Sequence, residues 1–391
     1  MRVVLTAPSL SRSFGGPPVV AAALRDGLEG LGREVEVLGC GDGALPVVAR
    51  FHGTPIPRRW RPIRRAVERA DVVHVLGYRD AVGTAAALTA IRRGTPLVVE
   101  PLGMHRSRLR SVGLKAAFDR LLGNRLIRNA AAVVATSRLE AAELEEDGVP
   151  GGRIRLRPNG VEPSFLPLPS RGGLRSRLGI PAAAPVALSL GRIAAKKGLL
   201  HLVAALPRLP GVFAVVAGPP DPADGTLDRL VRLAGELSVT DRVRLISEGL
   251  WGEEKAQAFA DADCFCLPSA TENFGIAAAE AAVAGIPAVV SDRCGVADWL
   301  DPAATRVVPY GSVEELASAL GEVLSDPAAL REARRAADAV ARALDWGALS
   351  RLQSAIYEQV TMAGGPPSKP IPSKLARPSQ TLNSASAGDR W

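Results

Sequence analysis

Short apolar runs that alternate with helical stretches constrain the fold of this chain most strongly. Helical patterns such as those over 18–31 and 80–93 separate runs that are too short to be helices and nearly free of polar residues. Such runs are typical of parallel strands that are buried on both faces. The expected strands of a first series are Val3–Ala7, Glu34–Leu38, Val72–Leu76, Leu97–Glu100 and Ala131–Ala135. Those of a second series are Val186–Leu190, Phe213–Ala217, Val243–Ile246, Cys264–Leu267 and Ala288–Ser291. The repetition predicts an α/β protein with two doubly wound, Rossmann-like domains.

The chain has 391 residues, a length that suits two domains of ordinary size. A proline-rich stretch over 165–169 predicts the boundary, giving domains 1–170 and 171–362. The last helix is expected to pack back on the first domain. The segment 363–391 is rich in Gly, Pro, Ser and Ala, and the composition predicts a disordered tail. Because ligands of doubly wound domains bind at the carboxyl ends of the strands, we expect the site in the cleft between the two domains.

Composition narrows the class of protein. No run of 18 apolar residues exists, and the apolar start at Met1 is too short for a signal-peptide core, so we expect a cytoplasmic protein. The cysteines lack metal-ligand spacing, which predicts buried, reduced thiols and no metal site. They are Cys40, Cys264, Cys266 and Cys294.

The net charge of +8 belongs to the first half of the chain. Residues 1–165 hold 25 Lys and Arg against 16 Asp and Glu, whereas the remainder holds 23 against 24. One basic cluster spans Arg58–Arg65 and includes Trp60, and another spans Arg106–Arg128. They suit either an anionic membrane surface or plain solvated helix faces, and no nucleic-acid module accompanies them.

The segment 271–287 carries the strongest chemical signal. Asn273 suits a helix N-cap, and Gly285 followed by Pro287 suits a helix end. Between them Glu280 is the only charge among small and apolar residues, so the helix should be buried and its carboxylate should need a partner from a hydroxyl-rich ligand. Glu272 lies in the preceding loop, and the free amides around Phe274 and Gly275 form an anion site. Two carboxylates beside an anion site suit a nucleotide sugar.

Two further loops fit a diphosphate. Gly191-Arg192 follows the strand 186–190 and precedes Lys196-Lys197-Gly198, so cations and close backbone approach are available at a strand's carboxyl end. Gly218 ends the next strand. The loop with Gly15-Gly16 joins the first strand to the first helix and can approach a phosphate. Taken alone, each loop is equally typical of an ordinary charged or βα turn.

Taken together, these motifs resemble those of the family 4 retaining glycosyltransferases, the glycosyltransferase group 1 enzymes of GT-B fold. The resemblance covers roughly residues 1–360. Its most specific part is the Glu272-x7-Glu280 spacing with Asn273-Phe274-Gly275. Supporting segments are Val72–Val75, Arg157–Glu162, Gly191-Arg192, Lys197-Gly198, Ala262–Ser269 and Ala284–Pro287.

The resemblance implies a role for each matching residue. Glu280 would hold the ribose of the donor nucleotide, and Glu272 would contact the donor sugar near the reacting carbon. Arg192 and Lys197 would neutralise the diphosphate in place of a metal, so that a nucleotide-diphosphate sugar is co-substrate and no cofactor is needed. The remaining implied donor contacts are Gly16 and the amides of Phe274, Gly275 and Ile276.

One departure concerns the edge where reaction would occur. Many family members carry His-Gly after the strand that corresponds to 97–100, and here Leu102-Gly103 stands there. The groups that could replace that histidine are the Leu102 carbonyl, Gly103, His105, His74 and Glu100. For His74 the favoured alternative is an ordinary hydrogen-bonded histidine near a strand end.

The sequence therefore predicts a retaining, metal-independent glycosyltransferase. Its acceptor would be a glycan, a lipid-linked sugar or a small molecule, in cell-surface polysaccharide biosynthesis and at the inner face of the membrane. The alternatives are a catalytically inactive GT-B binding or regulatory subunit, a sugar-nucleotide epimerase, and a dehydrogenase suggested by Gly39-x-Gly41-x-Gly43.

Overall fold

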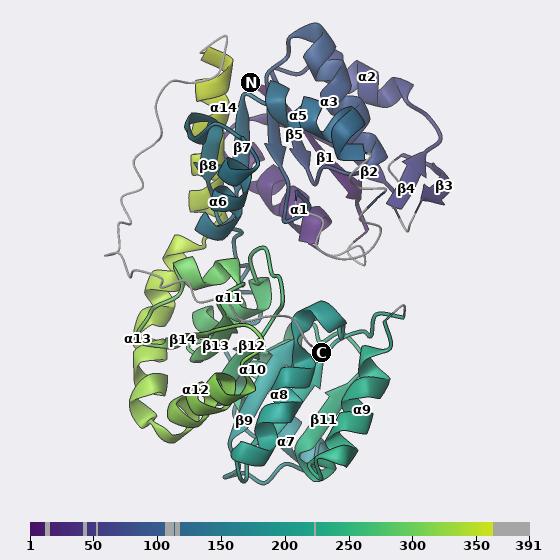
Figure 1. Ribbon diagram of the computed structural model, residues 1–391. Coiled ribbons are helices and arrows are strands. Elements are labelled where there is room, and N and C mark those ends of the chain that lie inside the picture. Colours follow the sequence, from purple (N-terminus) through teal and green to yellow (C-terminus); the bar gives the residue numbers. More distant parts are fainter. Residues whose placement is uncertain are drawn as a thin grey trace.

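Two parallel six-stranded sheets form the framework of the protein (Figure 1). The computed structural model describes residues 1–11, 16–41, 45–51, 54–105, 113, 118–222 and 224–362. The first sheet has the order β2-β1-β5-β6-β7-β8, and the second has the order β11-β10-β9-β12-β13-β14. Their strands are β1 (Arg2–Ser9), β2 (Glu34–Cys40), β5 (Val72–Leu76), β6 (Leu97–Glu100), β7 (Ala132–Ala135), β8 (Ile154–Leu156), β9 (Val186–Leu190), β10 (Phe213–Ala217), β11 (Val243–Ile246), β12 (Cys264–Leu267), β13 (Ala288–Ser291) and β14 (Thr305–Val308).

Helices connect the strands and cover the sheets (Figure 1). In the first half they are α1 (Gly16–Glu29), α2 (Arg61–Glu68), α3 (Ala81–Arg93), α5 (Asn124–Asn129) and α6 (Arg138–Glu146). In the second half they are α7 (Gly173–Arg177), α8 (Leu199–Ala205), α9 (Thr226–Glu236), α10 (Gly252–Asp261), α11 (Ile276–Val283), α12 (Val313–Ser325), α13 (Pro327–Ala343) and α14 (Trp346–Met362). This arrangement confirms the predicted fold class, two doubly wound domains that face one another.

All ten predicted strands are present. All but β2 and β11, which lie at the other edge of each sheet, are buried along almost their whole length, which explains why the apolar pattern found them. The prediction missed β8 and β14, the outer strands at one edge of each sheet; they are three and four residues long, and each includes an arginine. It also missed an antiparallel ribbon of β3 (Val47–Phe51) and β4 (Thr54–Pro57). That ribbon projects from the rim of the first domain (Figure 1).

The chain returns to the first domain at its end. Helix α14 lies beside α1, and Tyr357, Ile356 and Val360 are buried in the same core as β1. The approach is close, because a Cβ added at Gly27 of α1 would lie 2.1 Å from Oγ of Ser350 on α14. The last helix therefore links the two halves mechanically.

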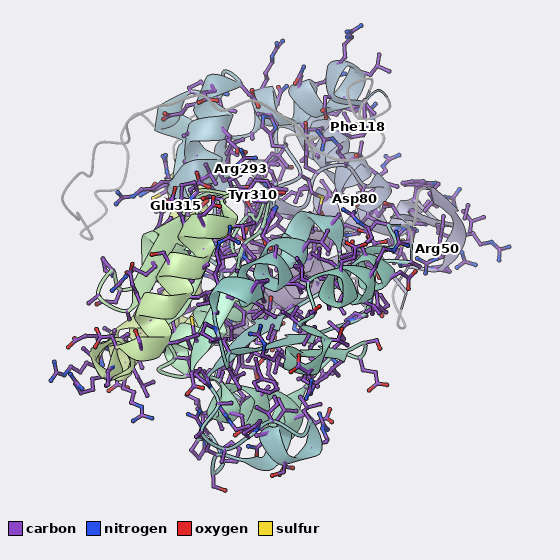
Figure 2. All side chains as sticks on the ribbon, turned by 60° about the horizontal axis from the view of Figure 1, so that its bottom comes forward. Arg50, Asp80, Phe118, Arg293, Tyr310 and Glu315 are labelled. Atoms are coloured by element: carbon purple, nitrogen blue, oxygen red, sulfur yellow. The ribbon has the colours of Figure 1, made fainter. Side chains whose placement is uncertain are left out.

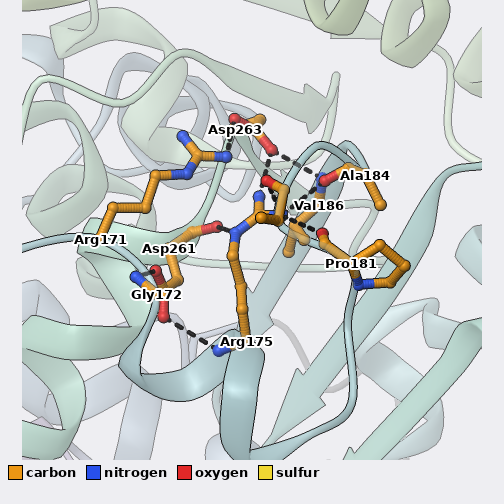
Figure 3. A network of polar contacts seen from close by, with 9 residues as sticks. Arg171, Gly172, Arg175, Pro181, Ala184, Val186, Asp261 and Asp263 are labelled. Carbon is orange, nitrogen blue, oxygen red and sulfur yellow. Dashed lines mark hydrogen bonds and ion pairs between the residues drawn. The ribbon is translucent and has the colours of Figure 1, made fainter.

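A polar network fixes the start of the second domain (Figure 3). Arg175 of α7 is 2% exposed, and its Nη2 lies 2.7 Å from Oδ2 of Asp263. Asp261 accepts the amide of Leu174 at 2.7 Å, and Asp263 also accepts the amide of Val186 at the start of β9. These bonds anchor the amino ends of β9 and β12 and leave their carboxyl ends free for a site.

Among the described helices, none is long and apolar enough to cross a membrane.

Candidate functional site

The loops after β9 and β10 pack closely at the carboxyl edge of the second sheet. Gly191 has φ +136° and Gly218 has φ +150°, and a Cβ on Gly218 would lie 2.0 Å from the Gly191 carbonyl oxygen. Only glycine suits either position. Arg192 follows, is exposed and pairs with none of the described residues. Its guanidinium is thus available to an anion at this edge.

Lys197 and Glu272 form an ion pair in the middle of the site. Nζ of Lys197 lies 2.5 Å from Oε2 of Glu272, and each side chain is 16% exposed. Burial acts to raise the pKa of Glu272, but Lys197 and the neighbouring Lys196 outweigh it and lower that pKa overall. Glu272 is therefore a carboxylate, and its lysine partner can be released to a ligand phosphate.

Helix α11 begins later than the sequence indicates. Its N-cap is Gly275, with φ +101°, so the expectation that Asn273 caps the helix is wrong. The amide of Asn273 instead reaches across to the first domain, where Nδ2 donates to Oγ1 of Thr136 at 2.9 Å. The amide groups at the start of a helix have no acceptor within the helix. An anion site at Gly275 and Ile276 therefore stays a prediction.

The predicted end of α11 is confirmed. Gly285 has φ +75°; its amide donates to the Ala282 carbonyl at 3.0 Å, and the next amide, of Ile286, donates to the Ala281 carbonyl at 2.9 Å. These two bonds form a Schellman motif, which satisfies carbonyls that a helix end otherwise leaves free. The short helix thus holds Glu280 in a fixed place.

Glu280 has a protein partner, contrary to the expectation of an unpaired charge. Nζ of Lys255, on α10, lies 2.7 Å from Oε1 of Glu280. Burial raises the pKa of Glu280, and Lys255 offsets part of that rise. Lys255 also lies 5.4 Å from the ring of Phe165. The sequence showed no cation inside the helix and gave no sign that one 25 residues earlier would fold onto it.

His74 and Glu100 do not reach the cleft. Both are fully buried: Nδ1 of His74 lies 2.7 Å from the Tyr357 hydroxyl of α14, and Nη2 of Arg157 lies 2.5 Å from Oε2 of Glu100. Burial lowers the pKa of His74, so the imidazole is neutral. Their assignment to the reaction edge is wrong, and His74 is a hydrogen-bonded core histidine in the middle of β5.

Leu102 and Gly103 do lie at the edge between the domains. They are the central residues of a turn closed by the Met104 amide on the Pro101 carbonyl, at 3.0 Å, and their φ values are +53° and +74°. A left-handed leucine costs about 1–2 kcal/mol, so surrounding contacts must hold it. A Cβ on Gly103 would lie 2.6 Å from Cβ of Asn273. The first domain thus touches the loop that carries Glu272, at the next residue.

The remaining predicted residues take other positions. Nε2 of His105 lies 3.1 Å from Oδ2 of Asp147, which directs its ring toward the first domain's own surface. Phe274 is buried in the core of the second domain. Gly16 opens α1 and is exposed, whereas Gly15 lies outside the described residues.

A small polar pocket between the domains contains residues that the sequence did not single out. It is lined by Gly103, Ser137, Leu139, Glu140, Glu143, Thr271, Glu272 and Asn273. Glu140 was detectable only as the last position of Ser137-x-x-Glu140, a helix-start pattern. Arg293 was also missed: it lies against Tyr310 (Figure 2), 4.9 Å from the ring, and its carbonyl accepts the Glu272 amide at 3.0 Å. The stacked pair supports the loop that carries Glu272.

Within the described ranges, no group of three or more His, Cys, Asp or Glu side chains could hold a metal ion. The cationic groups near the predicted diphosphate position are Arg192, Lys196 and Lys197. These three side chains place positive charge at this edge of the sheet, and metal independence stays a prediction.

Two Rossmann-like domains with their carboxyl edges facing define the GT-B class of glycosyltransferases. The solved structure of HepE from Anabaena, in complex with UDP and glucose, is similar over 92% of this chain and 99% of that chain, with a TM-score of 0.71 and 18% identity. A likeness at that identity concerns the fold alone.

The sequence comparisons then identify the family. The family model described as glycosyl transferases group 1 matches residues 171–342, and the glycosyl transferase 4-like domain matches residues 15–160. A D-inositol 3-phosphate glycosyltransferase of Xylanimonas cellulosilytica is 31% identical over 304 residues, 74% of this chain and 72% of that protein. A glycogen synthase of Mycobacterium tuberculosis is 31% identical over 247 residues, 59% of this chain and 55% of that protein. The chain belongs to the group 1 glycosyltransferases, family 4, which confirms the resemblance seen in the sequence.

Proposed function

We propose that this glycosyltransferase moves a sugar from a nucleotide-diphosphate sugar with retention of anomeric configuration and without a metal ion. The observation that carries the proposal is the Lys197–Glu272 pair, 2.5 Å apart, at the amino end of α11. The carboxylate offers acceptors to sugar hydroxyls. The released lysine and the exposed Arg192 offer charge to the diphosphate, where negative charge develops as the bond to the sugar breaks.

Each matched residue then has one task. Glu280 binds ribose hydroxyls after exchanging Lys255 for them, and the amides of Gly275 and Ile276 face the phosphates. Lys197 and Arg192 stabilise the leaving diphosphate, which is the work a divalent cation does in other transferases. The Leu102 carbonyl, on the left-handed turn beside Asn273, replaces the histidine that other members carry at the reaction edge.

The experiment that tests the donor is a thermal-shift screen against UDP-, GDP- and ADP-sugars. A donor present at 100 times its Kd stabilises the protein by about 2.7 kcal/mol. Turnover or hydrolysis of that donor then separates an enzyme from an inactive binding subunit. The anomeric proton signal of the product reports retention, and an inverted product contradicts the mechanism. Full activity in EDTA is expected, and activity that returns only with Mg²⁺ or Mn²⁺ contradicts the role given to Lys197.

We propose an anionic acceptor bound by the first domain. The proposal is supported by the excess of positive charge in residues 1–165 and by the inositol phosphate named in the relatives. The family assignment favours this transfer over the epimerase and dehydrogenase alternatives. Product formation with D-inositol 3-phosphate tests it, with unphosphorylated inositol as the matched control. Equal rates with both acceptors would show that the enzyme does not recognise the phosphate.

A second acceptor class, a lipid-linked sugar in cell-surface glycan synthesis at the inner face of the membrane, is favoured by one surface of the first domain. Val48, in strand β3 of the ribbon, is 61% exposed, and Trp60, three residues after β4, is 46% exposed. The arginines close to Trp60 in the sequence are also exposed: Arg58, Arg59, Arg61, Arg64 and Arg65. Apolar side chains among cations suit an anionic bilayer. Of the other cluster, Arg106, Arg108, Arg110 and Lys115 lie outside the described residues.

Co-sedimentation with anionic vesicles at low and high ionic strength tests this surface, with neutral vesicles as control. Each arginine near the bilayer contributes about 1 kcal/mol and is screened by salt. Trp60→Ala should weaken binding. No sedimentation at low salt would leave the arginines as a solvated face and favour the soluble acceptor.

A further inference from the structure

Glu140 is a buried carboxylate to which neither the sequence motifs nor the proposed reaction gives a task. It lies on the first turn of α6, is 4% exposed, and lines the pocket between the domains. No lysine or arginine pairs with it among the described residues. Burying a carboxylate without a cation is costly unless several donors satisfy it.

A helix cap alone does not explain this carboxylate. In an ordinary capping box, the glutamate three residues after the N-cap bonds the amide of the N-cap residue. The N-cap here is Ser137, whose Oγ accepts the Glu140 amide at 3.1 Å, as the box requires. The Glu140 carboxylate accepts two other amides: Oε2 accepts the Thr136 amide at 2.8 Å, and Oε1 accepts the Gly103 amide at 2.7 Å. Glu140 thus bonds a loop 37 residues away.

The bond to Gly103 holds the strained turn at the reaction edge. Leu102 and Gly103 are both left-handed, and their turn is the part of the first domain that touches Asn273. Arg79 fixes the following carbonyls, of Met104 and His105, from another direction. In the described part of the chain, the Gly103 amide is held by Glu140 and by no other group.

The same carboxylate orients the contact between the domains. The Thr136 hydroxyl donates to Oε2 of Glu140 at 3.0 Å, which leaves its lone pair toward the second domain. That lone pair accepts Nδ2 of Asn273 at 2.9 Å. An unbroken chain of hydrogen bonds therefore runs from Gly103 through Glu140 and Thr136 to Asn273, the neighbour of Glu272.

We infer that Glu140 is a positioning residue for sugar transfer: through the Gly103 amide and the Thr136 hydroxyl it sets the Leu102–Gly103 turn of one domain against the Glu272–Asn273 loop of the other. It does not touch the substrate. Its effect is on the placement of the Leu102 carbonyl relative to the donor sugar, and misplacement of about 1 Å at a reacting centre lowers a rate by as much as 10²-fold.

Glu140→Gln tests the inference with nearly the same shape. A glutamine keeps one acceptor oxygen but presents its amide group to a donor, so the Gly103 and Thr136 donors cannot all be satisfied. Amide exchange measures this without any activity: the Gly103 or the Thr136 amide should exchange at least roughly tenfold faster than in the wild-type protein. Glu145→Gln, which removes an exposed charge from the same helix, should leave both amides unchanged.

The kinetic readout rests on the proposed function. With an active donor, kcat of Glu140→Gln should fall roughly 10- to 100-fold while KM for the donor stays within about threefold, because the donor loop itself is intact. Thr136→Val should likewise lower kcat and leave KM for the donor almost unchanged. Thr136→Ser, which keeps the hydroxyl, should retain most of kcat. Wild-type kcat in both Glu140→Gln and Thr136→Val would overturn the inference.

The exchange measurement separates this inference from the proposed function. If the wild-type protein turns over no nucleotide sugar, the proposed function fails, and faster exchange at Gly103 or Thr136 in Glu140→Gln still supports the hydrogen-bond chain. Unchanged exchange at both amides would overturn it, whatever the activity. Should Glu140→Gln fold poorly, the same two measurements on Thr136→Val decide.

Discussion

Four carboxylates, two in each domain, fall into two pairs that are held in opposite ways. In the second domain, Glu272 and Glu280 are 16% and 14% exposed, and each has one lysine partner. In the first domain, Glu100 is fully buried with Arg157, and Glu140 is 4% exposed and held by neutral donors alone. A partly exposed lysine can be exchanged for a ligand, whereas a buried set of partners cannot. The second domain thus holds its two carboxylates with partners that a ligand can replace, whereas the first domain holds its two inside the fold.

The largest expected effect comes from breaking the buried Glu100–Arg157 pair of the first domain. Arg157→Met should lower the free energy of unfolding by about 3–5 kcal/mol, because Glu100 is left as a buried charge without its cation. Chemical denaturation measures it. Arg64→Met, which breaks the exposed pair with Glu68, should cost at most about 1 kcal/mol. Equal losses in the two variants would contradict the contrast between the pairs.

An effect nearly as large is expected on catalysis from the second domain. Lys197→Ala and Arg192→Ala should each lower kcat/KM by roughly 10²–10³, about 3–4 kcal/mol of leaving-group stabilisation. Steady-state kinetics with the active donor measure it. Arg208→Ala, at an exposed pair with Glu314 in the same domain, serves as the control for loss of a positive charge. Undiminished activity in Lys197→Ala would mean that Lys197 does not stabilise the leaving group.

Glu140 should give stability and activity opposite pH dependences. Burial raises its pKa from the ordinary 4.5 to about 7, so the folded protein binds the proton more tightly than the unfolded chain. The stabilisation is complete below pH 4.5 and is lost as the pH rises through 7, a change of roughly 3 kcal/mol. Transfer, which needs the ionised acceptor, should rise over the same range.

Denaturation at several pH values, for the wild-type protein and Glu140→Gln, measures that change. The variant should lack this part of the pH dependence and should gain stability relative to the wild-type protein as the pH rises from 5 to 8. Glu145→Gln should follow the wild-type curve. Parallel curves for Glu140→Gln and the wild-type protein would show that Glu140 titrates normally.

The smallest effect concerns the ribose carboxylate. Glu280→Gln should weaken nucleotide binding about tenfold, or ~1.4 kcal/mol, because a neutral amide still bonds hydroxyls but loses the stronger charged acceptor. Calorimetric titration with the nucleoside diphosphate measures it. Glu253→Gln, an exposed change on the helix that carries Lys255, is the matched control. An unchanged Kd would move the ribose away from Glu280.

The loop and helix that carry Glu272 and Glu280 were predictable because their signals are local in sequence. Glu272 and Glu280 are eight positions apart, on one loop and the helix that follows it, and the Schellman end at Gly285 has a one-residue signature. Even here, the partners were not predictable. Lys255 comes from a different helix, and Asn273, which suits an N-cap, is drawn away to Thr136 of the other domain.

The sequence by itself determined the alternation of buried strands and helices, and therefore the two doubly wound domains. A buried strand is a short apolar run, which can be recognised from its own residues without knowledge of the rest of the fold. It also determined the family and the donor motifs. Only the tertiary structure decided which charges are free to bind. His74 meets Tyr357 across 283 residues, and Glu140 meets Gly103 across 37. Such pairings depend on where the folded sheets and α14 place each side chain, and the free energy of a charge depends on that surrounding rather than on its neighbours in sequence.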